Sequence, residues 1–261
     1  NGDVVIAMAS SRDSVSFSSF LKLDAFTAQD LILDRGQLIS GSSNKVIVAN
    51  DVDATGASDS SFVDGIVQKI GNDAFTFPVG DSIYYRPISI SAPATTSDTF
   101  TAEYFHVNPD SVTPTPYTRT SKDAVINNVG ACEYWTLDRG VGGSDEVVTL
   151  SWDSVVSCHV ADYLSLGVGR WDGSMWRDHG GASHTGNNQS GTVASSGVVS
   201  SFSPFTLVSY SGLNVLPVDL LTFDAFAESD PNRVRLEWST ASEINNDFFT
   251  IERSAHGIHW D

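Results

Sequence analysis

The sequence is poor in basic residues and lacks long apolar runs. Only 14 of its 261 residues are Lys or Arg, against 32 Asp and Glu, which leaves a net charge of −18. Nucleic acid requires a basic face on its partner, and anionic membrane surfaces attract basic segments. No apolar stretch reaches the length of a membrane span. We therefore expect neither nucleic acid as a partner nor direct membrane insertion.

Cysteine is also scarce, with Cys132 and Cys158 as the only two. Each lies in or beside a predicted strand. In an exported protein, such a pair forms a cross-strand disulfide. The alternative is two buried free thiols, which are common core residues. The sequence leaves both alternatives open.

Strand and turn formers dominate what remains. Ser, Thr, Gly, Val and Asp are frequent, and 41% of the residues are hydrophobic, which is enough for a packed core. This mixture favours strands and turns over helices. We predict an all-β chain with an acidic, solvated exterior.

Residues 1–60 contain short apolar runs at close spacing, separated by turn residues. Examples are residues 31–33, 37–39 and 45–48. Short strands at such spacing are typical of a β-solenoid or of the edge of a sandwich. The repeat is too degenerate to fix a period. We predict a solenoid-like segment over residues 1–60.

Residues 61–211 alternate strand patterns with turns. Gly71-Asn72-Asp73 between two alternating runs predicts a hairpin, and Asp172-Gly173-Ser174 predicts another. Residues 108–130 are rich in Pro, Thr and Asn and predict a long irregular crossing. The whole region predicts an antiparallel β-sandwich.

Residues 216–261 form a further module after a short linker. Residues 216–226 form its first predicted strand, and residues 233–240 and 248–254 alternate as two more. Three strands with one open edge rarely make a stable domain. We therefore expect this module to be the first half of a second sandwich, truncated in this chain.

The last module carries the most specific pattern. LPVDLLTF at 216–223, VRLEWSTASEINNDFFTIERS at 234–254 and GIHW at 257–260 resemble a module of Bacteroidetes-type secreted proteins. There it precedes the sorting domain of type IX secretion system cargo and is fibronectin type III-like. Residues 62–80, 169–176 and 201–207 resemble other parts of the same protein class. The resemblance implies export, an extracellular or cell-surface location and a multidomain parent, and it implies no catalytic residue.

One loop partly matches a calcium-binding pattern. Oxygen-bearing side chains at alternate positions, with Gly56 at the sixth, suit a hard cation in a tight turn. Phe62 occupies the twelfth position, where a bidentate Glu is required. The alternative is an acidic turn, so Ca²⁺ is the one cofactor considered. The candidate ligands are Asp51, Asp53, Thr55 and Asp59.

Aromatic residues give a second candidate site. Trp171 and Trp176 flank the predicted tight turn at 172–174. Exposed aromatic rings stack on sugars, whereas Trp at alternating positions commonly fills a sandwich core. His179 and His184 share a Gly-rich loop but lack a third ligand at zinc-binding spacing.

No catalytic motif is present, because the sequence contains no Gly-x-Ser-x-Gly, no His-Glu-x-x-His and no phosphate loop. We therefore expect no enzyme activity. The first hypothesis is a structural or adhesive module whose partners are neighbouring domains or copies of the same surface protein. The second is a carbohydrate-binding module, or an accessory domain of a secreted polysaccharide-degrading enzyme, with polysaccharide as the partner.

Overall fold

The computed structural model describes residues 4–8, 10, 13–16, 21–23, 30–214, 220–227, 233–240 and 251. The described residues form strands and loops with no α-helix, which confirms the all-β prediction. Two short 3₁₀ segments occur, η1 (Pro109–Ser111) and η2 (Tyr163–Ser165). The chain divides into two compact units, Asn1–Asn214 and Val215–Asp261.

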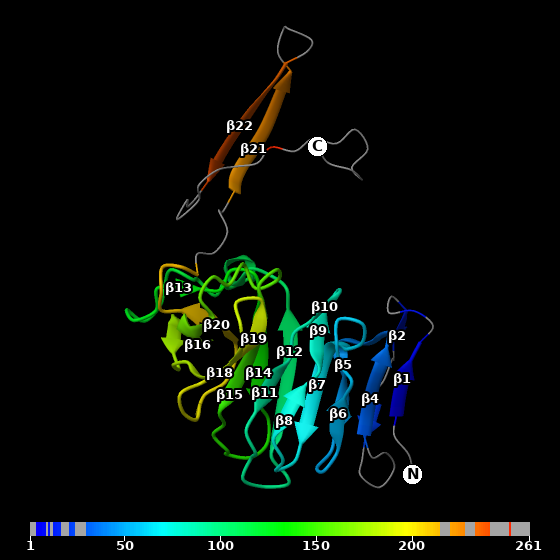
Figure 1. Cartoon of the computed structure of the whole chain (residues 1–261). Coiled ribbons are helices and arrows are strands. Elements are labelled where there is room, and N and C mark those ends of the chain that lie inside the picture. The colour runs from blue at the N-terminus through cyan, green and yellow to red at the C-terminus, as the bar shows by residue number, and fades with distance from the viewer. Residues whose placement is uncertain are drawn as a thin grey trace. The chain divides into compact units, whose positions relative to one another are not determined.

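The first unit begins with turns of chain whose strands lie side by side in parallel (Figure 1). In one sheet, β1 (Val4–Ala7) pairs with β4 (Asp30–Arg35), and β4 pairs with β6 (Asp53–Thr55). In a second sheet, β2 (Ser14–Ser16) and β3 (Leu21–Leu23) pair with β5 (Gln37–Val48), which pairs with β7 (Val63–Ile70). Paired residues in adjacent turns are 21 to 28 positions apart, as in Val46 with Val67 and Ala7 with Arg35.

A bulge shapes the contact between β5 and β7. The register shifts on both sides of Gly41, which lies opposite Gly65. Gly65 has φ +126°, and a Cβ there would lie 2.1 Å from the hydroxyl of Ser40. The Ser40 hydroxyl accepts a hydrogen bond from the backbone N–H of Ile66 at 2.7 Å. Only glycine fits this bend at position 65.

Strand β7 continues into the largest sheet. Along its opposite edge β7 pairs in parallel with β9 (Val79–Asp81) and in antiparallel with β12 (Thr99–Phe105). We call the parallel-paired strands β1 to β7 the parallel stack. Strand β7 therefore belongs both to this stack and to the antiparallel part of the sheet, although the sequence predicted a boundary between the two regions near residue 60. The sheet runs in the order β10 (Tyr84–Tyr85), β9 (Val79–Asp81), β7, β12 (Thr99–Phe105), β14 (Tyr134–Arg139), β20 (Phe205–Ser209), β16 (Leu166–Trp171) and β17 (Trp176–Asp178), with β13 (Asn128–Val129) beside β20.

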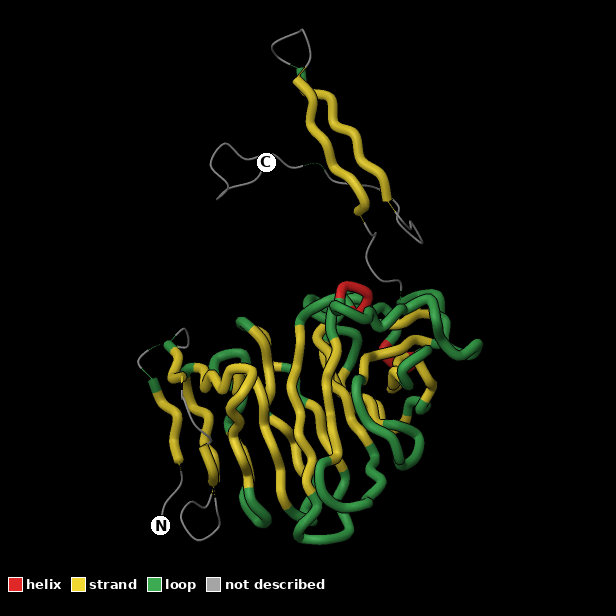
Figure 2. The backbone as a smooth tube through the Cα atoms, turned by 180° about the vertical axis from the view of Figure 1, so that it is seen from behind, coloured by secondary structure: helices red, strands yellow, loops and turns green. Residues whose placement is uncertain are grey.

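A five-stranded antiparallel sheet forms a second layer, which Figure 2 shows from behind. Its order is β18 (Ala182–Gly186), β19 (Ser190–Ala194), β15 (Val148–Asp153), β11 (Ile88–Ile90) and β8 (Phe75–Phe77). The hairpin predicted at residues 71–73 is wrong, because β7 and β8 lie in different sheets. The hairpin predicted at residues 172–174 is confirmed, since Trp171 and Trp176 are directly paired.

Two apolar clusters flank the large sheet. The main core takes residues from the parallel stack and from both antiparallel sheets, including Leu31, Val67, Trp135 and Leu150. Because side chains alternate along a strand, β16 and β20 also present residues to the opposite face. There the loop that precedes β14 covers a smaller cluster made of Ile126, Val129, Trp171, Trp176 and Val208, with Tyr117 and Tyr210 packed against it.

The second unit contains one antiparallel pair, β21 (Leu220–Ala227) and β22 (Val234–Thr240). Phe223 lies opposite Trp238, and Ala225 lies opposite Leu236, so apolar residues share one face of the pair. The third strand predicted for this module, at residues 248–254, lies outside the described residues except for Ile251.

Candidate functional site

Two of the predicted calcium ligands have hydrogen-bond partners in different segments of the chain. Asp51 lies just before β6, and its backbone N–H is 3.4 Å from a carboxylate oxygen of Asp73. The Asp59 carboxylate, beyond the far end of β6, accepts a hydrogen bond from the backbone of Tyr85 at 2.7 Å. Among the described residues, no three His, Cys, Asp or Glu side chains are placed to hold a metal ion. Asp51, Asp53 and Asp59 therefore belong to no such group, and the calcium site at Asp51, Asp53, Thr55 and Asp59 stays a prediction.

The two tryptophans proposed as a sugar platform are buried. Trp171 is 7% exposed and Trp176 is 0% exposed. Their ring centroids lie 5.7 Å apart at an interplanar angle of 62°. The Trp176 indole N–H donates to the carbonyl of Tyr117 at 3.1 Å. A stacking platform needs an open ring face, so the structure corrects this prediction and assigns both residues to core packing.

The loop histidines have separate partners. The guanidinium of Arg170 donates to His179 Nε2 at 3.4 Å, whereas His184 Nε2 lies 2.8 Å from the carbonyl of Leu166. Burial lowers the pKa of His179, and the positive charge of Arg170 lowers it further. Nothing in this geometry joins the two rings at one site.

The cysteines are bonded to each other. Cys132 and Cys158 form a disulfide with their Cα atoms 5.7 Å apart. Cys132 lies just before β14, and Cys158 lies in the turn that follows β15. The bond therefore ties the large sheet to the five-stranded sheet. The sequence had left a pair of free thiols open as the alternative.

Next to the disulfide lies a buried charged cluster, which we call the Glu133 cluster: Arg86, Tyr104, Glu133 and Asp153. Glu133 is 2% exposed and Arg86 is 5% exposed. The Tyr104 hydroxyl donates to Glu133 Oε2 at 2.8 Å. Arg86 Nε lies 3.9 Å from the same oxygen, and Arg86 Nη2 lies 3.9 Å from Asp153 Oδ1. Both ion-pair distances are too long for direct hydrogen bonds.

The electrostatics of the cluster favour a proton on Glu133. Burial raises the pKa of Glu133 to about 7, even though hydrogen bonds from Ser157 and Tyr104 and the charge of Arg86 act in the opposite direction. Glu133 Oε1, Arg86 Nε and Arg86 Nη2 are buried without a hydrogen-bond partner among the described residues. Burial and the adjacent Glu133 also raise the pKa of Tyr104 strongly.

Three carboxylates gather on the outer face of the large sheet. Asp64, Asp81 and Glu103 come from β7, β9 and β12 and are each partly buried. Burial raises the pKa of Glu103 to about 7, and the charges of Asp64 and Asp81 add to the shift. Burial raises the pKa of Asp64 as well, with the charge of Asp81 as the second cause.

An aromatic pair adjoins these carboxylates. Phe105 and Tyr134 stack with ring centroids 4.8 Å apart and an interplanar angle of 14°. Burial is the main cause that raises the pKa of Tyr134 to about 12, and the charges of Glu103 and Asp81 contribute. We call Asp64, Asp81, Glu103, Phe105 and Tyr134 the outer-face patch. Sequence reasoning missed it because its members come from four strands.

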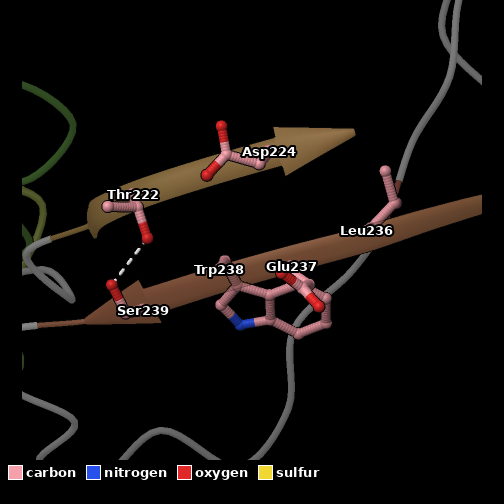
Figure 3. A pocket seen from close by; sticks show the side chains of 6 residues that line it. All are labelled: Thr222, Asp224, Leu236, Glu237, Trp238 and Ser239. Atoms are coloured by element: carbon pink, nitrogen blue, oxygen red, sulfur yellow. Dashed lines mark hydrogen bonds between the residues drawn. The ribbon is translucent and has the colours of Figure 1, made fainter. Parts of the chain in front are cut away.

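In the second unit, an open hollow lies on the β21–β22 pair (Figure 3). Thr222 and Ser239, opposite each other, are joined by a hydrogen bond of 2.6 Å between their hydroxyls. Like-charged Asp224 and Glu237 are also directly opposite, which disfavours the pair slightly. The lining residues are Thr222, Asp224, Leu236, Glu237, Trp238 and Ser239.

Comparison of the chain with protein-family models, with curated proteins and with solved structures finds no match. Within the part of the chain that the structure describes, no helix is long and apolar enough to cross a membrane.

Proposed function

We propose that this chain is a non-catalytic structural or adhesive module of an exported cell-surface or filament-forming protein. The observation that carries the proposal is the parallel stack, in which β1, β4 and β6 on one side, and β2, β3, β5 and β7 on the other, repeat after 21 to 28 residues. In such a solenoid-like stack each turn contacts only its neighbours, so the geometry suits an elongated, repetitive protein.

The antiparallel sheets support the same proposal. They share one core, as the layers of a sandwich do. The disulfide between Cys132 and Cys158 suits an oxidising compartment outside the cytosol. We further propose that the second unit is fibronectin type III-like, with β21 and β22 as two of its strands. The parent would then be an exported protein of the type IX secretion cargo class, with neighbouring domains or copies as partners.

The location is tested with an antibody raised against residues 30–214. We expect it to label intact cells of the source organism, or to detect the protein in the culture medium. Labelling that requires permeabilised cells would contradict export. The structural role is tested by limited proteolysis of the oxidised chain, in which we expect residues 30–214 to survive as one fragment. Rapid cleavage within β5 or β7 would argue against a rigid module.

Polysaccharide binding is the second candidate function, as a carbohydrate-binding module or as an accessory domain of a secreted polysaccharide-degrading enzyme. The outer-face patch is the observation in its favour, through the partly buried Phe105; Tyr134 is 7% exposed and only supports the Phe105 ring from behind. Sugar sites combine aromatic rings with carboxylate acceptors, and Phe105 lies on the same face of β12 as Glu103. The buried Trp171 and Trp176 no longer support it.

A glycan array followed by titration of any bound oligosaccharide tests this alternative. Phe105→Ala and Glu103→Gln should each weaken binding by at least about tenfold, which corresponds to 1.4 kcal/mol. Leu164→Ala serves as the control, because Leu164 is exposed and lies in η2, outside the patch. If no glycan binds, the alternative is rejected.

A further inference from the structure

The disulfide and the Glu133 cluster are adjacent at both ends of the bond. Cys132 directly precedes Glu133, and Cys158 directly follows Ser157. The Ser157 hydroxyl accepts the backbone N–H of Asp153 at 3.0 Å and acts to lower the pKa of Glu133. The turn from Asp153 to Cys158 therefore forms one wall of the cluster, and the disulfide fixes this wall to the start of β14.

The turn also has an unusual backbone next to the disulfide. Cys158 and His159 have φ angles of 60° and 64°, in the left-handed region that side-chain-bearing residues rarely adopt. The local hydrogen bonds run from Ser157 N–H to the Asp153 carbonyl at 2.6 Å and from His159 N–H to the Ser154 carbonyl at 2.9 Å. One longer-range backbone bond, from the Ser154 N–H to the Gln189 carbonyl at 2.7 Å, ties the start of the turn to the residue that precedes β19. At its other end, the disulfide ties Cys158 to Cys132, beside Glu133.

We propose that the Cys132–Cys158 disulfide and the Glu133 carboxyl form a coupled redox and proton switch, in which the bond keeps water from Glu133 and reduction of the bond lets Glu133 ionise. This inference goes beyond the proposed structural function and is independent of it. The groups that face Glu133 are Arg86 from the β10–β11 connection, Tyr104 from β12 and Asp153 from β15. Arg86 also has a second acidic neighbour, because its Nη1 lies 3.8 Å from Asp59 Oδ1.

The chemistry of the switch is conventional. A dithiol reductant supplies two electrons and two protons, the Cys132–Cys158 bond breaks to two thiols, and the reductant closes to a cyclic disulfide. Glu133, once hydrated, releases its proton to solvent at any pH above the ordinary range of a glutamate. By linkage, each event favours the other.

The test is the equilibrium between the full chain and mixtures of reduced and oxidised dithiothreitol, with thiols trapped and counted at pH 5.5 and at pH 7.5. On reduction, the Glu133 pKa should return from about 7 to the ordinary glutamate value of 4.5. The equilibrium constant for reduction then rises by about 20-fold between pH 5.5 and pH 7.5, beyond the contribution that thiol ionisation makes in every variant. In Glu133→Gln, which has no proton to release, this excess rise should vanish.

Glu103→Gln is the matched control, because the Glu103 pKa is also raised to about 7 but Glu103 lies in the outer-face patch. It should retain the full excess rise. Should Glu103→Gln flatten the pH dependence as much as Glu133→Gln does, reduction unfolds the unit globally and the local switch is rejected. Equal pH dependence in wild type and Glu133→Gln would also reject it.

Tyr104→Phe keeps the proposal testable if Glu133→Gln does not fold. The Tyr104 hydroxyl stabilises the ionised form of Glu133 in the oxidised protein. Its removal raises the Glu133 pKa further and should increase the excess rise above that of wild type. An unchanged or smaller rise in Tyr104→Phe contradicts the coupling.

Discussion

Replacement of Trp176 by alanine tests whether this residue is part of the core or a binding platform. Trp176 is fully buried, and its indole N–H is bonded to the carbonyl of Tyr117. Its backbone N–H donates to the Ser121 carbonyl at 2.8 Å, and its carbonyl accepts from Asp123 at 2.9 Å. The side chain thus packs at the point where β17 holds the irregular crossing against the sheet.

The magnitude follows from these contacts. Truncation of a buried aromatic residue to alanine costs about 3–5 kcal/mol. The Tyr117 carbonyl also loses its donor, which adds about 1 kcal/mol. Domains have a total stability of about 5–15 kcal/mol. We therefore expect Trp176→Ala to lower the free energy of unfolding of the first unit by about 4–6 kcal/mol.

Urea unfolding followed by circular dichroism measures this loss as a lower midpoint. Val155→Ala is the matched control, because Val155 is 90% exposed and its truncation should change stability by less than about 0.5 kcal/mol. A midpoint for Trp176→Ala equal to that of the control would refute the assignment of Trp176 to the core. The platform hypothesis would then be open again.

Three further predictions concern buried charge and the disulfide. The Glu133 pKa is raised from 4.5 to about 7 in the folded chain, so the stability that its protonated form contributes is present at acidic pH and is lost as pH rises through about 7. The loss amounts to about 3 kcal/mol of unfolding free energy. Urea midpoints measured from pH 5 to pH 8 should therefore depend less on pH in Glu133→Gln than in wild type. Replacement of Cys132 and Cys158 by serine should cost about 3.5 kcal/mol for a sequence separation of 26, and wild type in excess reductant should reproduce that loss in a thermal melt. Lys69→Met should lower the free energy of unfolding by about 3 kcal/mol. The buried Lys69 ammonium donates to two backbone carbonyls, and its Nζ lies 2.6 Å from Asp73 Oδ2. A urea midpoint within error of wild type would show that these bonds contribute nothing.

Local sequence patterns predicted turns well where two strands adjacent in the sequence pair with each other. Asp172 accepts hydrogen bonds from the backbone N–H groups of Ser174 and Met175, so the hairpin at residues 172–174 is encoded within a few residues. Gly71-Asn72-Asp73 carries equally strong turn residues, yet it leads the chain from one sheet to the other. Turn chemistry determines that the chain bends, but pairing depends on burial contributed by distant strands.

The candidate sites were less predictable than the strands. Arg86 and Glu133 are 47 positions apart and come together only through the order of the sheets. A single Arg and a single Glu in an acidic sequence carry no local signal. The tryptophans gave a strong signal, but sequence alternation does not tell which face of a sheet is covered. The irregular crossing that covers Trp171 and Trp176 decides this, and its path has no periodic pattern.

Strand β7 has a consequence for how the first unit can be divided. It is the only route by which the parallel turns connect to the antiparallel strands of the same sheet within the described residues, and it uses both of its edges to do so. A fragment that starts at residue 61 would leave one edge of β7 open to solvent, and open edges recruit other chains. Such a fragment should be prone to aggregation, and the first unit should melt as one cooperative body with no stable half.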